Sequence, residues 1–241
     1  MLTVLTQMVC ETLNATPGVV VAELPDTSRT PDSGTTTASR QTVVSGEAAC
    51  IAARSLQVEL ELLMAGGKTQ EEALHILDGR EYYGEFCPET DPMGSDKQFP
   101  VSHVAYSYAA QVVELDRQGK VLKVTAAYDV GTVVNPKAAQ GQLEGGIVMG
   151  VGYGLTEEFP VKDGYPTAKL GTLGLIRAAD APEIETIFVN SGVRLPVAFG
   201  AKGLGELATI PTAPAIQGAY YKLDGVFRQK LPMEDTYYSK T

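Results

Sequence analysis

The stretch Gly200-Ala201-Lys202-Gly203-Leu204-Gly205-Glu206 precedes Pro211-Thr212-Ala213-Pro214, near the end of the 241-residue chain. Three glycines within six residues permit positive φ and a close approach of backbone N–H groups to a ligand. Such a bend can form an anion-binding nest with the carboxylate of Glu206 at its rim. The alternative is a strand-to-helix turn, in which Glu206 only favours the positive end of the following helix.

The composition is that of a globular protein able to bury one large core or two modest ones, with 44% hydrophobic residues and 25 glycines. A net charge of −10 without any basic run argues against nucleic acid and against an anionic membrane surface. A small molecule or another protein is the expected partner. Cys10, Cys50 and Cys87 are too few and too dispersed for a disulfide framework or a zinc site, so a cytoplasmic location is expected.

Hydrophobic spacing predicts alternating helices and strands, and hence an α+β fold of mixed helices and antiparallel strands. Helices are expected over about residues 2–13, 43–64, 69–77 and 135–153. Strands are expected over about 19–24, 81–86, 104–115, 121–130 and 184–189, with the third and fourth joined as a hairpin. The whole chain, residues 1–241, is expected to form one cofactor-binding domain, and the polar, proline-containing segment 88–100 is where it can change lobes.

Two further segments suit ligand binding. The polar loop from Pro25 to Thr42 leads into the second helix, and Ser39 at its end either lies in a phosphate-binding site or simply caps the helix. Gln142 approaches the glycine-rich fourth helix, and its amide can donate and accept, although a solvated glutamine is the simpler interpretation. The five glycines between Gly145 and Gly154 lower helix propensity, so close packing or a ligand must account for them.

Four motifs in order resemble the molybdenum-binding subunit of the xanthine dehydrogenase and aldehyde oxidase family. They are Thr30-Pro31-Asp32-Ser33-Gly34 with Ala38-Ser39-Arg40-Gln41-Thr42, Asp129-Val130-Gly131 with Asn135-Pro136, Gly141-Gln142-Leu143-Glu144-Gly145-Gly146, and Gly203-Leu204-Gly205-Glu206. The segments at residues 91–97, 166–169 and 205–211 are most similar to bacterial selenium-dependent xanthine dehydrogenases. Many relatives have two prolines where Leu207 and Ala208 stand here, and this difference lies next to Glu206.

The resemblance implies a C-terminal molybdopterin-binding portion that hydroxylates an electron-poor carbon, such as that of a purine, with water as the oxygen source. Glu206 would be the catalytic base, a role that suits a carboxylate within hydrogen-bond reach of the proton it removes. Gln142 would lie near the metal's oxygen ligands. The pterin and its phosphate or nucleotide tail would contact Ser39, Arg40, Gln41, Ala201, Lys202 and Gly203, and no side chain of this chain would bind the metal directly.

The resemblance also implies partners. Within the family a first portion of the molybdenum subunit, with another glutamine-bearing loop, would precede Met1, and iron–sulfur and flavin modules would lie on other chains or domains. The sequence is therefore expected to be a fragment or a split subunit, inactive alone and with a face for a partner or a second copy. Two other functional classes are the alternatives: a noncatalytic assembly protein that retains the fold, and an unrelated phosphate-binding module.

Overall fold

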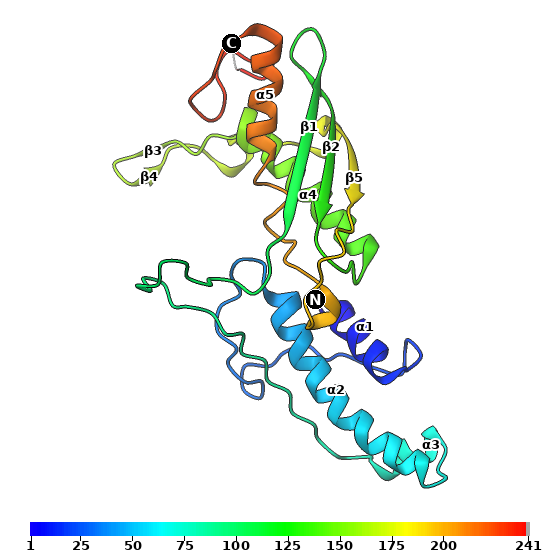
Figure 1. Cartoon of the computed structure of the whole chain (residues 1–241). Coiled ribbons are helices and arrows are strands. Elements are labelled where there is room, and N and C mark those ends of the chain that lie inside the picture. Colours follow the sequence, from blue (N-terminus) through cyan, green and yellow to red (C-terminus); the bar gives the residue numbers. More distant parts are fainter. Residues whose placement is uncertain (240–241) are drawn as a thin grey trace. The chain divides into compact units, whose positions relative to one another are not determined.

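The computed structural model describes residues 1–239, and the chain divides into two compact units (Figure 1). The first unit comprises Met1–Tyr106, Thr132–Asn135 and Val193–Gly203. The second comprises Ser107–Gly131, Pro136–Gly192 and the chain from Leu204 onward. The proline-containing segment 88–100 lies inside the first unit. None of the helices within residues 1–239 is long and apolar enough to cross a membrane.

Three helices form the first unit: α1 (Leu2–Leu13), α2 (Gln41–Ala65) and α3 (Gln70–Ile76). Helix α1 packs closely on α2, because a Cβ atom at Gly46 would lie only 2.6 Å from Met8 Cε. The core there consists of Met8, Val43, Cys50 and Ala198. Thr69 and Glu72 form the expected capping box at the start of α3, which confirms that sequence signal.

Two strands predicted for this unit do not form. Residues 19–24 are irregular and largely exposed, so their β-branched side chains have no sheet surface on which to pack. Residues 81–86 cross helix α2 instead of pairing with a strand. A Cβ at Gly84 would lie 2.1 Å from the carbonyl oxygen of Ala48 and 2.7 Å from the amide nitrogen of Ala52. Glycine is therefore required by contact with a helix, a distinction that the sequence alone does not make.

The second unit is built on a three-stranded sheet with the order β1-β2-β5. The predicted hairpin is confirmed: β1 (Tyr108–Leu115) pairs antiparallel with β2 (Val121–Asp129). Strand β5 (Glu183–Phe188) pairs with β2 in parallel, so the sheet holds one parallel pair beside the expected antiparallel one. Parallel pairing requires a long connection, and the one between β2 and β5 includes helix α4 (Pro136–Leu155). The α+β class itself is confirmed.

Helix α5 (Thr212–Asp224) contacts both β1 and α4, and α4 also contacts β5 (Figure 1). The glycines of α4 allow this packing. A Cβ at Gly146 would lie 2.6 Å from Ala208 Cβ, and one at Gly150 would lie 2.5 Å from Thr212 Cβ. Close packing on the segment that leads into α5 thus explains Gly146 and Gly150. The remaining elements are a small hairpin and three short 3₁₀ turns: β3 (Val161–Lys162), β4 (Tyr165–Pro166), η1 (Leu170–Thr172), η2 (Ala178–Asp180) and η3 (Ala198–Gly200).

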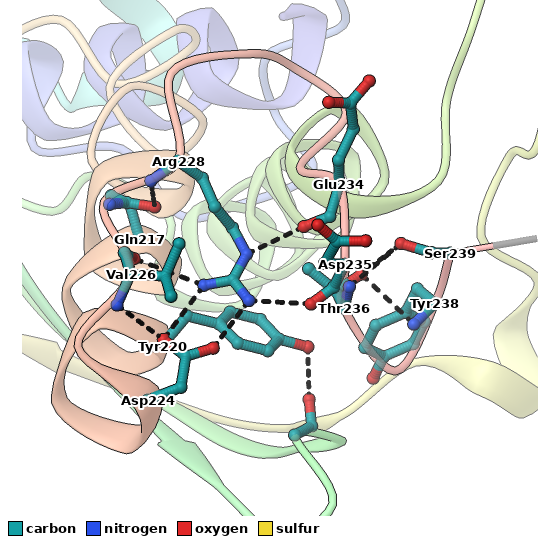
Figure 2. A network of polar contacts seen from close by, with 11 residues as sticks. Gln217, Tyr220, Asp224, Val226, Arg228, Glu234, Asp235, Thr236, Tyr238 and Ser239 are labelled. Atoms are coloured by element: carbon teal, nitrogen blue, oxygen red, sulfur yellow. Dashed lines mark hydrogen bonds and ion pairs between the residues drawn. The ribbon is translucent and has the colours of Figure 1, made fainter.

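The C-terminal segment after α5 is held by Arg228 (Figure 2). Its guanidinium forms an ion pair with Asp224 at 2.7 Å, donates to the main-chain oxygens of residues 234 and 235, and lies 4.8 Å from the centre of the Tyr220 ring. The Tyr220 hydroxyl in turn donates to the Gly119 carbonyl at 2.5 Å, in the turn between β1 and β2. The C-terminal segment, α5 and the β1–β2 turn are thereby joined within the second unit.

Candidate functional site

The loop before α2 contains two successive residues in the left-handed region of the backbone. Ala38 and Ser39 both have positive φ, 51° and 56°, which non-glycine residues rarely adopt. The N-cap of α2 is Arg40, whose own side chain makes no capping hydrogen bond. Both interpretations of Ser39, phosphate binding and capping, stay predictions. Because the first amides of a helix have no partner within the helix, the start of this 25-residue helix can receive an anion.

Arg40 and Gln41 lie at the same helix start with exposed side chains. The Arg40 guanidinium folds back over the loop, and its Nη2 donates to the Thr35 carbonyl at 2.7 Å. A positive charge and the positive end of the helix dipole are thus placed beside each other, and both favour a negatively charged ligand. We name residues 37–41 the α2 entry loop.

Gly203 lies against the α2 entry loop. A Cβ at Gly203 would be 3.3 Å from both the Cβ and the carbonyl oxygen of Ser39, and 3.4 Å from the carbonyl oxygen of Ala38. The two segments that the sequence singled out are therefore adjacent within the first unit, although they are more than 160 residues apart in the chain. Ala201 and Lys202, which precede Gly203, are buried.

In the second unit Gln142 contacts the segment that carries Glu206. Gln142 lies on α4, and its Nε2 donates to the carbonyl oxygen of Gly205 at 3.0 Å. Gln142 is exposed to solvent and also makes this contact, so it is not held by solvent alone. Glu206 itself is exposed. A contact between Gln142 and a bound ligand stays a prediction.

The chain after Glu206 is held by a side chain that the sequence analysis missed. Gln111, on β1, donates from Nε2 to the carbonyl oxygen of Ala208 at 2.9 Å and to the Tyr128 hydroxyl at 2.8 Å. Thr212 Oγ1 donates to the same carbonyl at 3.0 Å. Carbonyl groups on both sides of Glu206 are thus fixed by side chains. No sequence motif marks Gln111, because its contact joins residues 97 positions apart.

The predicted site residues therefore fall into two groups, and the members of each group lie close together within one unit. The α2 entry loop with residues 201–203 belongs to the first unit, and Gln142 with Glu206 belongs to the second. The chain connects the two groups directly at Gly203–Leu204. Within the described part of the chain, residues 1–239, no group of three or more His, Cys, Asp or Glu side chains is placed to hold a metal ion.

Residues 1–182 match the family model described as the molybdopterin cofactor-binding domain, and the chain belongs to that family. It is 28% identical, over 94% of its length, to a probable xanthine dehydrogenase subunit of Bacillus subtilis (strain 168). It is 30% identical, over 96% of its length, to the gamma subunit of the 6-hydroxypseudooxynicotine dehydrogenase complex of Paenarthrobacter nicotinovorans. These alignments cover 34% and 33% of the two relatives, so the chain spans about a third of their length.

Solved structures agree with this assignment. The aldehyde oxidoreductase from Desulfovibrio gigas superposes with a TM-score of 0.76 and 26% identity, over 94% of this chain and 26% of that one. The CO dehydrogenase from Oligotropha carboxidovorans superposes with a TM-score of 0.74 over 95% of this chain and 32% of that one, and at 21% identity this similarity shows the fold alone. The mixed helix and strand fold of this chain is thus that of molybdenum-binding domains.

Proposed function

We propose that the chain is the C-terminal part of the molybdenum-binding subunit of a xanthine dehydrogenase-type hydroxylase. In this proposal the enzyme oxidises a purine or a related heterocycle and takes the oxygen from water. The observation that carries the proposal is the family match over residues 1–182, together with the approach of Gly203 to the α2 entry loop at the start of a helix. The choice of a purine as substrate is supported by similarity to a probable xanthine dehydrogenase subunit over 94% of the chain.

The α2 entry loop fits the phosphate-bearing tail of a molybdopterin. The left-handed backbone at Ala38 and Ser39 and the start of α2 offer amide donors, and Arg40 adds a positive charge. A Cβ at Gly203 would intrude on the same loop, so glycine keeps the two segments in contact. Ser39, Arg40, Gln41 and residues 201–203 are the proposed contacts of the tail. The dinucleotide form of the cofactor would extend this contact.

Glu206 is the proposed catalytic base. When bound, the molybdenum–pterin group supplies the redox-active metal at which the substrate carbon is oxidised. Glu206 would accept a proton from the oxygen nucleophile, since a carboxylate can act as a general base once it lies within hydrogen-bond reach. Gln142 holds the Gly205 carbonyl and would thereby orient the base, while Gln111 and Thr212 hold the chain beyond it.

The proposal includes partners for the rest of the enzyme. An N-terminal portion of the molybdenum subunit would complete the cofactor site, and iron–sulfur and flavin components would accept the electrons. Both relatives described above are named as subunits of dehydrogenases, which supports an assembly of several chains. A cytoplasmic location and self-association of the isolated chain belong to the same proposal. The proposal also includes selenium in the active enzyme, and elemental analysis of the assembled enzyme tests this.

The proposed function is tested by comparing the isolated chain with the assembled enzyme. We expect the isolated chain to fold but to contain no tightly bound molybdenum or pterin, because it would offer only part of the walls that exclude water from the site. The assembled enzyme should contain both and should oxidise xanthine. An aldehyde is the second candidate substrate, favoured by 29% identity over 86% of the chain to an aldehyde oxidoreductase of Megalodesulfovibrio gigas. An isolated monomer with stoichiometric molybdenum that oxidises xanthine would contradict the proposal.

A further inference from the structure

A buried carboxylate on α2 contacts the turn before Gly203. Glu47 is 6% exposed, and its Oε2 accepts a hydrogen bond from the backbone N–H of Ala198 at 2.5 Å. Its Oε1 is paired with the Arg54 guanidinium, seven residues later on the same helix. Both groups belong to the first unit, and the contact joins residues 151 positions apart. Neither the family motifs nor the proposed catalytic residues include Glu47.

The turn that Glu47 contacts has an unfavourable backbone conformation. Ala198, Phe199 and Gly200 have successive positive φ values of 48°, 55° and 78°. Non-glycine residues keep such values only where the surrounding structure imposes them, and they concentrate at ligand-binding segments. On its other side the turn is held by Thr132, whose N–H donates to the Gly200 carbonyl at 3.0 Å. The next residues are Ala201, Lys202 and Gly203, which meet the α2 entry loop.

We propose that Glu47 is a positioning residue that fixes this turn, and through it residues 201–203, against the α2 entry loop. This inference rests on the proposed function, in which both segments contact the tail of the cofactor. Glu47 lies on the helix whose first turn follows the entry loop, so a single rigid element carries one segment and holds the other. The two strained segments, residues 38–39 and 198–199, are thereby kept in one arrangement.

The charge distribution explains why a carboxylate is suited to this role. A buried carboxylate is costly, and replacing a buried ion pair by apolar side chains of similar volume is often neutral or stabilising. A buried carboxylate is useful where each of its two oxygens must accept a hydrogen bond from a particular donor. One Glu47 oxygen is oriented by Arg54 within α2, independently of the turn, while the other receives the Ala198 N–H. The orientation of the acceptor thus has a support that lies outside the turn.

The test compares four variants in the assembled, pterin-containing enzyme. Glu47→Ala removes the acceptor. The double variant Glu47→Gln with Arg54→Gln removes both charges. It keeps an amide oxygen at position 47 for the Ala198 N–H, and an amide at position 54 for the second polar atom of the position 47 side chain. Arg54→Gln alone removes the orienting cation. Leu60→Ala is the stability control, because Leu60 is buried on the same helix in a separate cluster with Ala73 and Leu77. The measurements are the rate of pterin release and the amide hydrogen exchange of residues 198–203.

In Glu47→Ala we expect pterin release and exchange at residues 198–203 to accelerate by about tenfold or more, the effect of losing a hydrogen bond to a charged group. The double variant should restore both to within about threefold of the parent, since the acceptor geometry is retained. In Arg54→Gln both rates should lie between those of Glu47→Ala and those of the double variant. Leu60→Ala should lower thermal stability and leave pterin release unchanged.

Equal pterin release in Glu47→Ala and Leu60→Ala would overturn the inference, and so would failure of the double variant to rescue it. A failure of the proposed function would look different. In that case replacement of Ser39, Arg40 and Gln41 would also leave pterin retention unchanged. If that replacement weakens retention and Glu47→Ala does not, only the positioning role of Glu47 is wrong.

Discussion

The substitution Gly146→Ala tests how closely α4 packs on the segment that carries Glu206. The added Cβ would lie 2.6 Å from Ala208 Cβ and 3.3 Å from Thr209 Oγ1. Overpacking of this kind costs about 1–3 kcal/mol, whereas replacing a helical glycine by alanine returns about 0.5–1 kcal/mol. We therefore expect a net loss of up to about 2 kcal/mol.

Gly145→Ala is the matched control in the same helix. Among the described residues outside its own helix, no atom lies within 4 Å of a Cβ at Gly145. This variant should gain about 0.5–1 kcal/mol of stability. Because the gain in helix propensity is common to both variants, the difference between them isolates the packing cost, about 1–3 kcal/mol.

Urea unfolding of the two variants, followed by circular dichroism, measures this difference as a shift in midpoint at constant slope. In the assembled enzyme, Gly146→Ala should also lower turnover more than Gly145→Ala, since Ala208 is only two residues from Glu206. If Gly146→Ala is as stable as Gly145→Ala, the close contact between α4 and Ala208 is wrong, and so is the packing explanation of Gly146.

Two further predictions concern single side chains of the second unit. Glu206→Gln keeps the volume of the side chain but removes its basicity, so turnover of the assembled enzyme should fall by at least ~10²-fold with pterin content unchanged, and near-normal turnover would exclude Glu206 as the base. Tyr220→Phe leaves the buried Gly119 carbonyl without its donor and should cost about 1–3 kcal/mol in denaturant unfolding. Burial raises the pKa of Tyr220 to about 12, so stability should fall as the pH rises from 10 toward 12, because the unfolded state loses the proton first. That decline should be shallower in Tyr220→Phe, and an identical decline would contradict the assignment.

Much of the fold could be predicted from local signals. Three features depend only on residues close in the sequence. They are the capping box at Thr69, the turn between β1 and β2, and the spacing of apolar residues in α1. The two incorrect strands share a cause. Residues 19–24 and 81–86 have suitable strand residues, but a strand also needs a partner, and pairing is set by distant parts of the chain. The parallel direction of β5 is non-local in the same way.

The candidate site was predictable where motifs are contiguous, and not where contacts are long-range. The glycine bend and the α2 entry loop were both recognisable as segments, yet their contact at Gly203 and Ser39 follows only from the folded chain. Gln111 and Glu47 carry no local signal at all. Each acts on a backbone group about 100 to 150 residues away, through hydrogen bonds that no pattern of neighbouring residues encodes.

The central claim is that this chain binds the tail of a molybdenum–pterin cofactor through the α2 entry loop. The most direct test is the molybdenum and pterin content of the assembled enzyme with and without the combined replacement of Ser39, Arg40 and Gln41 by alanine. We predict stoichiometric pterin and molybdenum in the parent and a marked loss of both in the variant, with its unfolding midpoint unchanged. Full pterin content in the variant, or an assembled parent that contains none, would contradict the account.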